Sequence, residues 1–352
     1  MSPDFAPKHL RDLPPIPLDK PLDAHVIQMG MNENPFGPSP LAVEAMRWAL
    51  DRCNRYPDDT GYELRQKIAR RFKVSVDEVI VSAGASDLLG IAFNAVLDPV
   101  AEVLTSEGSF VVYYLLGEAT GMRMECVPLK DYAYDLETMA SRINSRTRLI
   151  LIANPNNPTG TITRRTQFER FLERVPSHVL LVMDEAYFEY VDTSEYPNSL
   201  DYLRSEKSIL TLRTFSKVYG LAGLRLGYGF ANHDVIDTLY KVRMTYSVSA
   251  PAIAGGLAAL DDVEHVERSV RLNRLERKFL MQELARRHVQ YIPSFTNFIL
   301  MDLGRPAAPV AERLLDQGLV VRPAWGIPNG LRLSIGLREH NEKFLSALER
   351  VL

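Results

Sequence analysis

The chain has 352 residues, of which 46% are hydrophobic and 24% are charged, and its formal net charge is −3. This composition is typical of a globular protein, and the near balance of charge argues against binding to nucleic acid or to an anionic membrane. The sequence has no apolar run near the roughly 18 residues that span a bilayer, and its two cysteines fit no metal or redox spacing, so we expect a cytoplasmic protein with free thiols.

The length suggests a large domain with a smaller domain appended to it. We expect an N-terminal extended arm over residues 1–35, because proline is frequent there and proline removes backbone donors and resists helix. We assign the large domain to residues 36–250 and a small C-terminal domain to residues 251–352, because the sequence pattern changes near residue 250.

Between about residues 62 and 235, helical stretches alternate with short apolar runs that we interpret as buried strands. These runs lie at 79–81, 103–104, 149–152, 179–183 and 209–212. Continuous apolar strands between helical patterns predict a mainly parallel α/β sheet. Ligand-binding residues in such a sheet lie in loops after the carboxyl ends of the strands, and Asn154, Asp184 and Ser216 fall at such positions.

The pattern after residue 250 predicts a smaller α+β domain. A long charged amphipathic helix is expected over residues 262–288. Short strand candidates follow at 297–302, 319–322 and 331–335, and a closing helix is expected from about 339 to 351.

Lys217 has the surroundings that pyridoxal 5′-phosphate (PLP) requires. It stands one residue after Ser216 and eight residues before Arg225, among several glycines. A lysine can form a Schiff base with the aldehyde of PLP, while the hydroxyl and the guanidinium can hold its phosphate. Glycines let the backbone approach the ring. The segment therefore predicts a PLP site.

Asp184 follows an apolar strand and is a candidate partner of the pyridine nitrogen of PLP, which it would keep protonated. Tyr187, three residues further on, can reach the 3-oxygen of the ring. Taken alone, an aspartate at this position also suits a helix N-cap. The Lys217 segment favours the cofactor interpretation.

Three further segments are compatible with the same ligand. Asn157 lies in a loop at residues 154–160, where prolines prevent helix. The loop is either only a rigid turn, or it presents Asn157 as a donor to the 3-oxygen. The small-residue loop at 84–87 opens a helix expected at 88–97 and suits an anion. Phe110 is either a core residue or an aromatic that stacks on the pyridine ring.

Arg332 alternates with apolar residues in a predicted strand, which implies an anionic partner that its guanidinium binds with two hydrogen bonds. Arg322 is a second inward candidate, whereas Arg338 is expected to be solvated near the start of the last helix. The seven histidines are scattered without metal-ligand spacing, so no metal site is expected.

Together these motifs resemble the aspartate aminotransferase superfamily of fold type I PLP enzymes, and within it the histidinol-phosphate aminotransferase family. The resemblance runs from residues 32–40 to residues 331–336. It implies the PLP-dependent transferase fold, with a mainly parallel central sheet in a large domain and a smaller α+β C-terminal domain.

The resemblance also implies a role for each candidate residue. Lys217 would be the Schiff-base lysine and proton shuttle, Asp184 the ring-nitrogen partner and Phe110 the stacking aromatic. Asn157 and Tyr187 would contact the 3-oxygen, with Asn157 also near the substrate. The phosphate ligands would be Ala85, Ser86, Thr214, Ser216 and Arg225.

Tyr56 matches a tyrosine that the family lends to the partner subunit, which implies a homodimer. Arg332 would bind the substrate carboxylate and Arg322 the substrate phosphate. Two departures concern the surroundings of the substrate: the segment 14–20 lacks the family's arm tyrosine, and residues 247–249 read Ser-Val-Ser where Asn-Val-Asn is usual.

The resemblance implies small-molecule partners, an amino donor and a 2-oxo acid. The reaction would convert histidinol phosphate and 2-oxoglutarate to imidazole-acetol phosphate and glutamate. An aminotransferase for aromatic or other amino acids remains an alternative, as does a decarboxylase of the threonine-phosphate decarboxylase type. A PLP-sensing regulator would need a DNA-binding domain, for which the N-terminal arm leaves no room.

Overall fold

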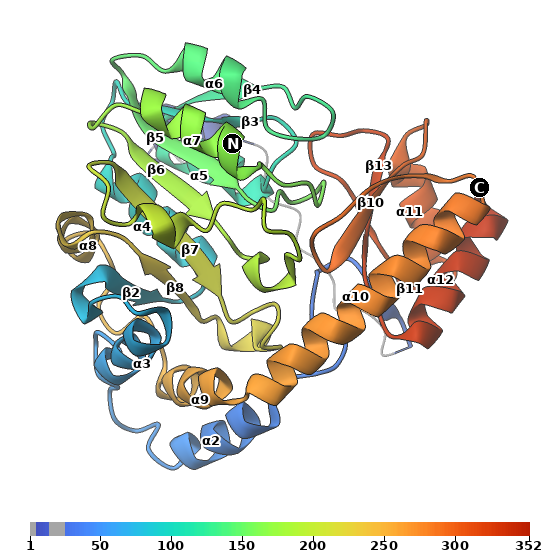
Figure 1. The fold of residues 1–352 in the computed structure, drawn as a ribbon, viewed down its shortest axis with the longest axis horizontal. Helices are drawn as coiled ribbons and strands as arrows, with labels where there is room; N and C mark the ends of the chain where they lie inside the picture. Colours follow the sequence, from blue (N-terminus) through green and yellow to red (C-terminus); the bar gives the residue numbers. More distant parts are fainter. Residues whose placement is uncertain (1–4, 14–24) are drawn as a thin grey trace.

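The computed structural model describes residues 5–13 and 25–352. The segment 14–20, where the arm tyrosine is missing, lies outside the described residues. A larger α/β body and a smaller body lie side by side (Figure 1). Among the described residues, no helix combines the length and the apolar character needed to cross a membrane.

The larger body is built on a seven-stranded sheet with the order β2-β8-β7-β6-β5-β3-β4. Five neighbouring strands, from β4 to β7, run parallel, and β8 is antiparallel to both β7 and β2. The prediction of a mainly parallel sheet is confirmed. The strands are β2 Val79–Ser82, β3 Glu102–Ser106, β4 Arg123–Val127, β5 Thr147–Ala153, β6 Leu180–Asp184, β7 Ser208–Thr214 and β8 Gly227–Phe230.

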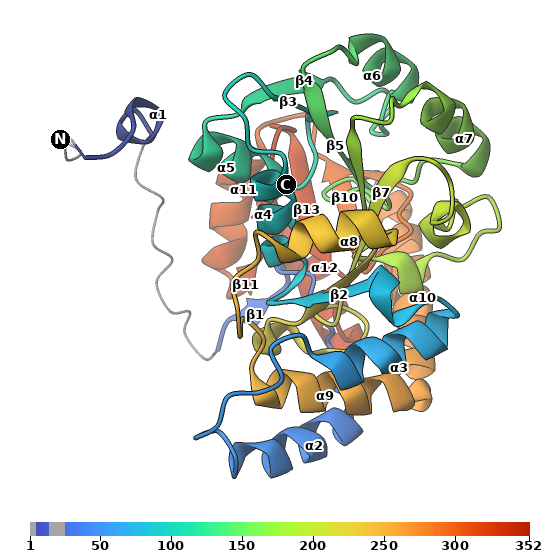
Figure 2. The ribbon, with the colours of Figure 1, turned by 90° about the vertical axis from the view of Figure 1, so that its left-hand side faces the viewer.

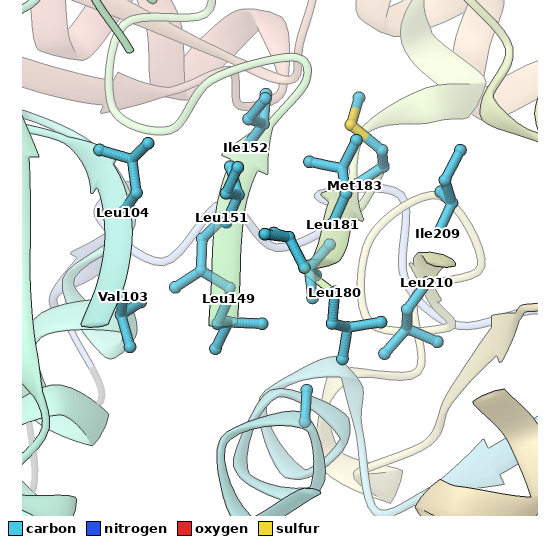
Figure 3. Close-up of a cluster of buried hydrophobic side chains, with 14 of the residues drawn as sticks. Val103, Leu104, Leu149, Leu151, Ile152, Leu180, Leu181, Met183, Ile209 and Leu210 are labelled. Atoms are coloured by element: carbon cyan, nitrogen blue, oxygen red, sulfur yellow. The ribbon is translucent and has the colours of Figure 1, made fainter. Parts of the chain in front are cut away.

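The central strands consist mainly of apolar residues because both faces of the sheet are covered. Leu149, Ile152 and Leu181 are fully buried, and the side chains of neighbouring strands contact one another in rows (Figure 3). Burial of this kind stabilises the fold by about 25 cal/mol per Å² of apolar surface. The helices that follow these strands are α4 Ala85–Ala95, α5 Val111–Thr120, α6 Leu136–Arg142, α7 Arg165–Arg174 and α8 His233–Tyr240.

Three helices pack together below the sheet: α2 Pro40–Leu50, α3 Tyr62–Phe72 and α9 Ala250–Asp261 (Figures 1 and 2). Ser39 caps α2, since its Oγ accepts from the backbone nitrogen of Ala42 at 3.2 Å and proline takes the first helical position. This N-cap fixes where the chain turns from the N-terminal segment into the large body.

The smaller body contains a four-stranded antiparallel sheet with the order β12-β13-β10-β9. Strand β1 Ile27–Gln28 pairs in parallel with β11 Leu319–Val320, so the N-terminal segment is attached to this body. The remaining elements are β9 Gln290–Ile292, β10 Phe298–Asp302, β12 Arg322–Pro323, β13 Gly330–Ser334, α10 Val263–Arg286, α11 Ala307–Leu315 and α12 Arg338–Val351.

The N-terminal arm differs in part from the extended conformation that was expected. Helix α1, Lys8–Arg11, begins directly after Pro7, whose carbonyl accepts from the backbone nitrogen of Arg11 at 3.1 Å. A proline is compatible with a helix when it precedes the first turn, since no intrahelical donor is lost there. The helix lies against α5, where His9 Nε2 is 3.3 Å from the carbonyl oxygen of Ala119.

Candidate active site

A cavity of about 760 Å³ lies between the two bodies, at the carboxyl edge of the parallel strands. Every residue that the sequence nominated for the site lines it, except Tyr56. These lining residues are Ala85, Ser86, Phe110, Asn157, Asp184, Tyr187, Thr214, Ser216, Lys217, Arg225, Arg322 and Arg332.

The topology of the sheet explains this convergence. Asp184 is the last residue of β6, Asn157 lies in the loop after β5, and Lys217 follows the end of β7. Because these strands are parallel neighbours, their carboxyl ends open onto one edge. Arg322 and Arg332 come from β12 and β13 of the smaller body and form the opposite wall.

The amine of Lys217 is held at the N-terminal segment. Its Nζ donates to the carbonyl oxygen of Met31 at 3.1 Å and lies 5.7 Å from the centroid of the Tyr187 ring. Burial lowers the pKa of Lys217 to about 8, and the nearby charges of Arg332 and Arg225 act in the same direction. A lysine with a lowered pKa has a larger neutral fraction, which a nucleophilic amine requires.

The carboxylate of Asp184 is buried and held by two donors. The hydroxyl of Tyr113 donates to Oδ2 at 3.0 Å, and the backbone nitrogen of Ala186 donates to Oδ1 at 3.1 Å. Burial raises the pKa of Asp184 to about 6, although both hydrogen bonds oppose the rise. A cation such as a protonated pyridine nitrogen would favour the ionised carboxylate.

A candidate anion site lies at the N-terminus of α4. This helix begins at Ala85, three residues earlier than expected, and its free backbone N–H groups and dipole favour a bound anion. A Cβ on Gly84 would lie 2.6 Å from Arg225 Nη2, so the missing side chain lets the guanidinium approach. Nη1 of Arg225 is 3.4 Å from the Oγ of Ser216. The arrangement suits a phosphate.

Tyr187 and Asn157 are both fixed by other polar groups. The hydroxyl of Tyr187 accepts from Asn32 Nδ2 at 2.9 Å. Oδ1 of Asn157 accepts from Arg332 Nη1 at 2.5 Å, so this asparagine orients the arginine and also lines the cavity. Both side chains are therefore held in defined orientations.

Arg322 and Arg332 are cross-strand partners in the β12–β13 ladder. Nη2 of Arg332 also donates to the carbonyl oxygen of Gly30 at 2.5 Å. Like charges directly opposite each other on a sheet destabilise it, and a bound anion between them would remove that cost. The pair therefore supports the anionic substrate group that the sequence predicted.

The remaining candidates divide into two groups. Phe110 lines the cavity, and its ring contacts Tyr113 edge-on at 5.7 Å, so it serves both the site and the adjacent core. Tyr56 is 84% exposed, and its ring packs on Tyr246 outside the cavity. Arg338 is half-exposed and pairs with Glu276 at 2.9 Å, so it is only partly the solvated charge that was expected.

Several residues in or beside the site were not predicted from the sequence, among them Tyr113, Asn32, Met31 and Trp325. Tyr113 lies in an apolar helix, where a tyrosine does not stand out as a site residue. Asn32 and Met31 lie in a segment to which the sequence assigned no role, and Trp325 lies in a loop between short strands. The position of Tyr113, three residues after the candidate Phe110, is the feature of the sequence that could have suggested it.

The chemical groups of the cavity fit PLP. Lys217 supplies an amine for the aldehyde, and Asp184 supplies a buried carboxylate for the ring nitrogen. The start of α4, with Arg225, offers a place for the phosphate. The groups come from the ends of β2, β6 and β7 and the segments that follow them, at one edge of the sheet. The fit therefore rests on the donor set as a whole.

The sequence matches the family model for aminotransferase class I and II over residues 24–348. It is 41% identical to histidinol-phosphate aminotransferase 2 of Pseudomonas fluorescens strain Pf-5, with 100% of this chain and 99% of that protein covered. It is 43% identical to histidinol-phosphate aminotransferase 2 of Pseudomonas aeruginosa, with 94% and 90% covered.

The fold is similar to that of a solved histidinol-phosphate aminotransferase from Sinorhizobium meliloti in complex with pyridoxal-5′-phosphate. The TM-score is 0.92 at 27% sequence identity, and the likeness covers 99% of this chain and 98% of that chain.

Proposed function

The chain belongs to the class I and class II aminotransferase family, its cofactor is PLP, and on this basis we propose that it is a histidinol-phosphate aminotransferase. The proposed reaction transfers the amino group of histidinol phosphate to 2-oxoglutarate and yields imidazole-acetol phosphate and glutamate. The relatives with 41% and 43% identity have this name, and the similarity covers nearly their whole length.

The observation that carries the proposal is the pair of arginines that faces Lys217 across the cavity. Arg322 and Arg332 bring two positive charges to one wall. A phosphate carries close to two negative charges at neutral pH and accepts several hydrogen bonds. The same wall can bind the two carboxylates of 2-oxoglutarate in the second half of the reaction.

Each residue of the site has a proposed task. When bound, PLP supplies a ring that accepts electrons and stabilises negative charge at the substrate Cα. Asp184 holds a proton on the ring nitrogen. Lys217 would bind the aldehyde of the cofactor and, as the neutral amine, would remove the proton from the substrate Cα. The start of α4, with Ser216 and Arg225, anchors the phosphate.

We further propose a cytoplasmic homodimer. Tyr56 is exposed and does not line the cavity of its own chain, as expected of a residue that serves the partner's site. Other large apolar side chains are exposed on α2 (Leu41, Trp48 and Leu50), at the start of α3 (Tyr62) and at Met244. Such patches are typical of protein interfaces. Cys53 and Cys126 are free thiols, as in a reducing compartment.

A half-reaction screen tests the proposed substrate. The protein loaded with PLP is mixed with one amino donor at a time, and the absorbance of the bound cofactor is followed. Rapid conversion by histidinol phosphate alone is expected. Conversion by phenylalanine or tyrosine, with none by histidinol phosphate, would contradict the proposal, and release of carbon dioxide would indicate a decarboxylase.

A further inference from the structure

Trp325 presents an indole to the cavity. It lies in the loop after β12, three residues beyond Arg322, and half of its surface is exposed. A half-exposed indole on the wall of a binding cavity offers a large apolar face that a planar ligand can cover. Neither the cofactor tasks nor the anion-binding arginines account for this residue.

The indole is held in place by the larger body. Its ring centroid lies 5.9 Å from that of Tyr114 on α5, at an interplanar angle of 39°. The hydroxyl of Tyr114 accepts from the backbone nitrogen of Ser109 at 3.2 Å and donates to the carbonyl oxygen of Ser106. The tyrosine is thereby fixed, and so is the face against which the indole packs.

Two glycines allow the loop that carries Trp325 to approach the larger body closely. A Cβ on Gly326 would lie 2.7 Å from the backbone nitrogen of Gly108, and both residues have positive φ, +71° and +65°. The Trp325 loop of the smaller body therefore rests directly on the larger body. These contacts hold the indole in place, which reduces the entropy lost when a ligand binds to it.

The cavity separates charged walls from an apolar one. The cations Arg225, Arg322 and Arg332 are suited to the phosphates of cofactor and substrate, whereas Trp325 and Val111 offer apolar surface. We propose that Trp325 is a specificity-determining residue that stacks on the planar heteroaromatic ring of the amino donor. This inference rests on the proposed function, because it places the imidazole of histidinol phosphate on the indole.

A purely structural role makes a different prediction. If Trp325 only joined the two bodies through Tyr114, its removal would loosen the cavity for every substrate alike. Ring stacking instead weakens only ligands that carry the ring. Two ligands separate these cases: histidinol phosphate, and 2-aminopropyl phosphate, which is the same molecule without the imidazole.

Binding is measured on the enzyme loaded with pyridoxamine phosphate, which cannot accept a second amino group and so gives equilibrium affinities without turnover. Calorimetry on Trp325→Ala should show about a tenfold loss of affinity for histidinol phosphate and less than a twofold loss for 2-aminopropyl phosphate. Trp325→Phe, which keeps a ring, should lose less than about threefold for either ligand.

Trp48 is the second tryptophan of the chain and lies on α2, away from the cavity. Trp48→Phe therefore leaves Trp325 as the single indole emitter, and its fluorescence should change on binding of histidinol phosphate but not of 2-aminopropyl phosphate. Equal losses for both ligands in Trp325→Ala, or no loss, would overturn the inference. If the unaltered enzyme neither binds nor converts histidinol phosphate, the proposed function fails instead.

Discussion

At the scale of single residues, burial sets the chemistry of the two central groups in opposite directions. It raises the pKa of Asp184 to about 6 and lowers that of Lys217 to about 8. Without cofactor, each group therefore loses charge more readily than in water. A bound PLP would offer Asp184 a cationic ring nitrogen, which favours the ionised carboxylate, and would offer Lys217 an aldehyde, with which the neutral amine reacts.

Asp184→Asn tests the role of the carboxylate with little change in shape. The amide oxygen can still accept from the backbone nitrogen of Ala186, and the amide nitrogen can donate to the hydroxyl of Tyr113, but the neutral amide cannot hold a proton on the ring nitrogen. We expect kcat to fall at least about 100-fold, while absorbance shows that PLP remains bound. Tyr113→Phe removes one hydrogen bond, worth about 1 kcal/mol, and should lower kcat less than about tenfold. A kcat of Asp184→Asn within tenfold of the original would contradict the assignment.

Lys217→Met tests the cost of burying the amine in the cofactor-free protein. The folded-state pKa lies below the unfolded value of 10.5, so the unfolded chain binds more protons between pH 8 and 10.5. The stability of the original protein therefore rises with pH across that window. Thermal melts should show the variant about 2 °C more stable near pH 7, with the gap shrinking as the pH passes 8. A gap that does not change with pH would count against a buried ammonium.

At the scale of elements, the parallel strands were predictable because their apolar runs are continuous. The run at 149–152, for example, corresponds to β5 Thr147–Ala153. The antiparallel direction of β8 was not predictable, since Gly227–Phe230 alternates glycine with aromatics and has no long apolar run. Most of the site followed from residues at strand ends, whereas Asn32 and Tyr113 are brought to it by tertiary packing alone.

The packing of β8 on the start of α4 predicts a requirement for glycine. A Cβ on Gly227 would lie 2.5 Å from the backbone nitrogen of Ala85, at the proposed phosphate site. Relief of that overlap costs about 1–3 kcal/mol, so Gly227→Ala should weaken PLP binding about tenfold or more, as measured by titration of the cofactor-free protein.

Gly90→Ala, inside helix α4, is the matched control for Gly227→Ala. Its Cβ would meet only Leu116, at an ordinary 3.9 Å, and alanine is favoured over glycine inside helices by roughly 0.5–1 kcal/mol. This variant should bind PLP normally. Equal PLP affinity in the two variants would refute the close-approach argument.

At the scale of the whole molecule, each chain contributes two walls to one cavity and offers one exposed apolar surface. The larger body provides Lys217 and the proposed phosphate site, and the smaller body provides the arginine pair. The tyrosine pair Tyr56–Tyr246, with ring centroids 4.8 Å apart, stands outside this arrangement. If a twofold dimer forms through that surface, both chains supply the same patch.

Hybrid dimers decide whether Tyr56 acts in the partner's site. The Lys217→Met chain lacks the amine in its own cavity but keeps Tyr56. The Tyr56→Ala chain lacks the tyrosine but keeps Lys217. In a mixed dimer, the cavity of the Tyr56→Ala chain keeps its own lysine and receives the partner's tyrosine. Random reassortment makes half of the dimers mixed, each with one complete site, so about a quarter of the original activity should return at limiting PLP.

The controls are the two parent variants assayed alone, at the same total protein and limiting PLP. Neither should approach the activity of the mixture, because every site of each parent lacks one of the two groups. If Tyr56 acted within its own chain, no cavity in the mixed dimer would hold both groups. The mixture would then show only the average of its parents, and the proposed exchange of Tyr56 between subunits would be wrong.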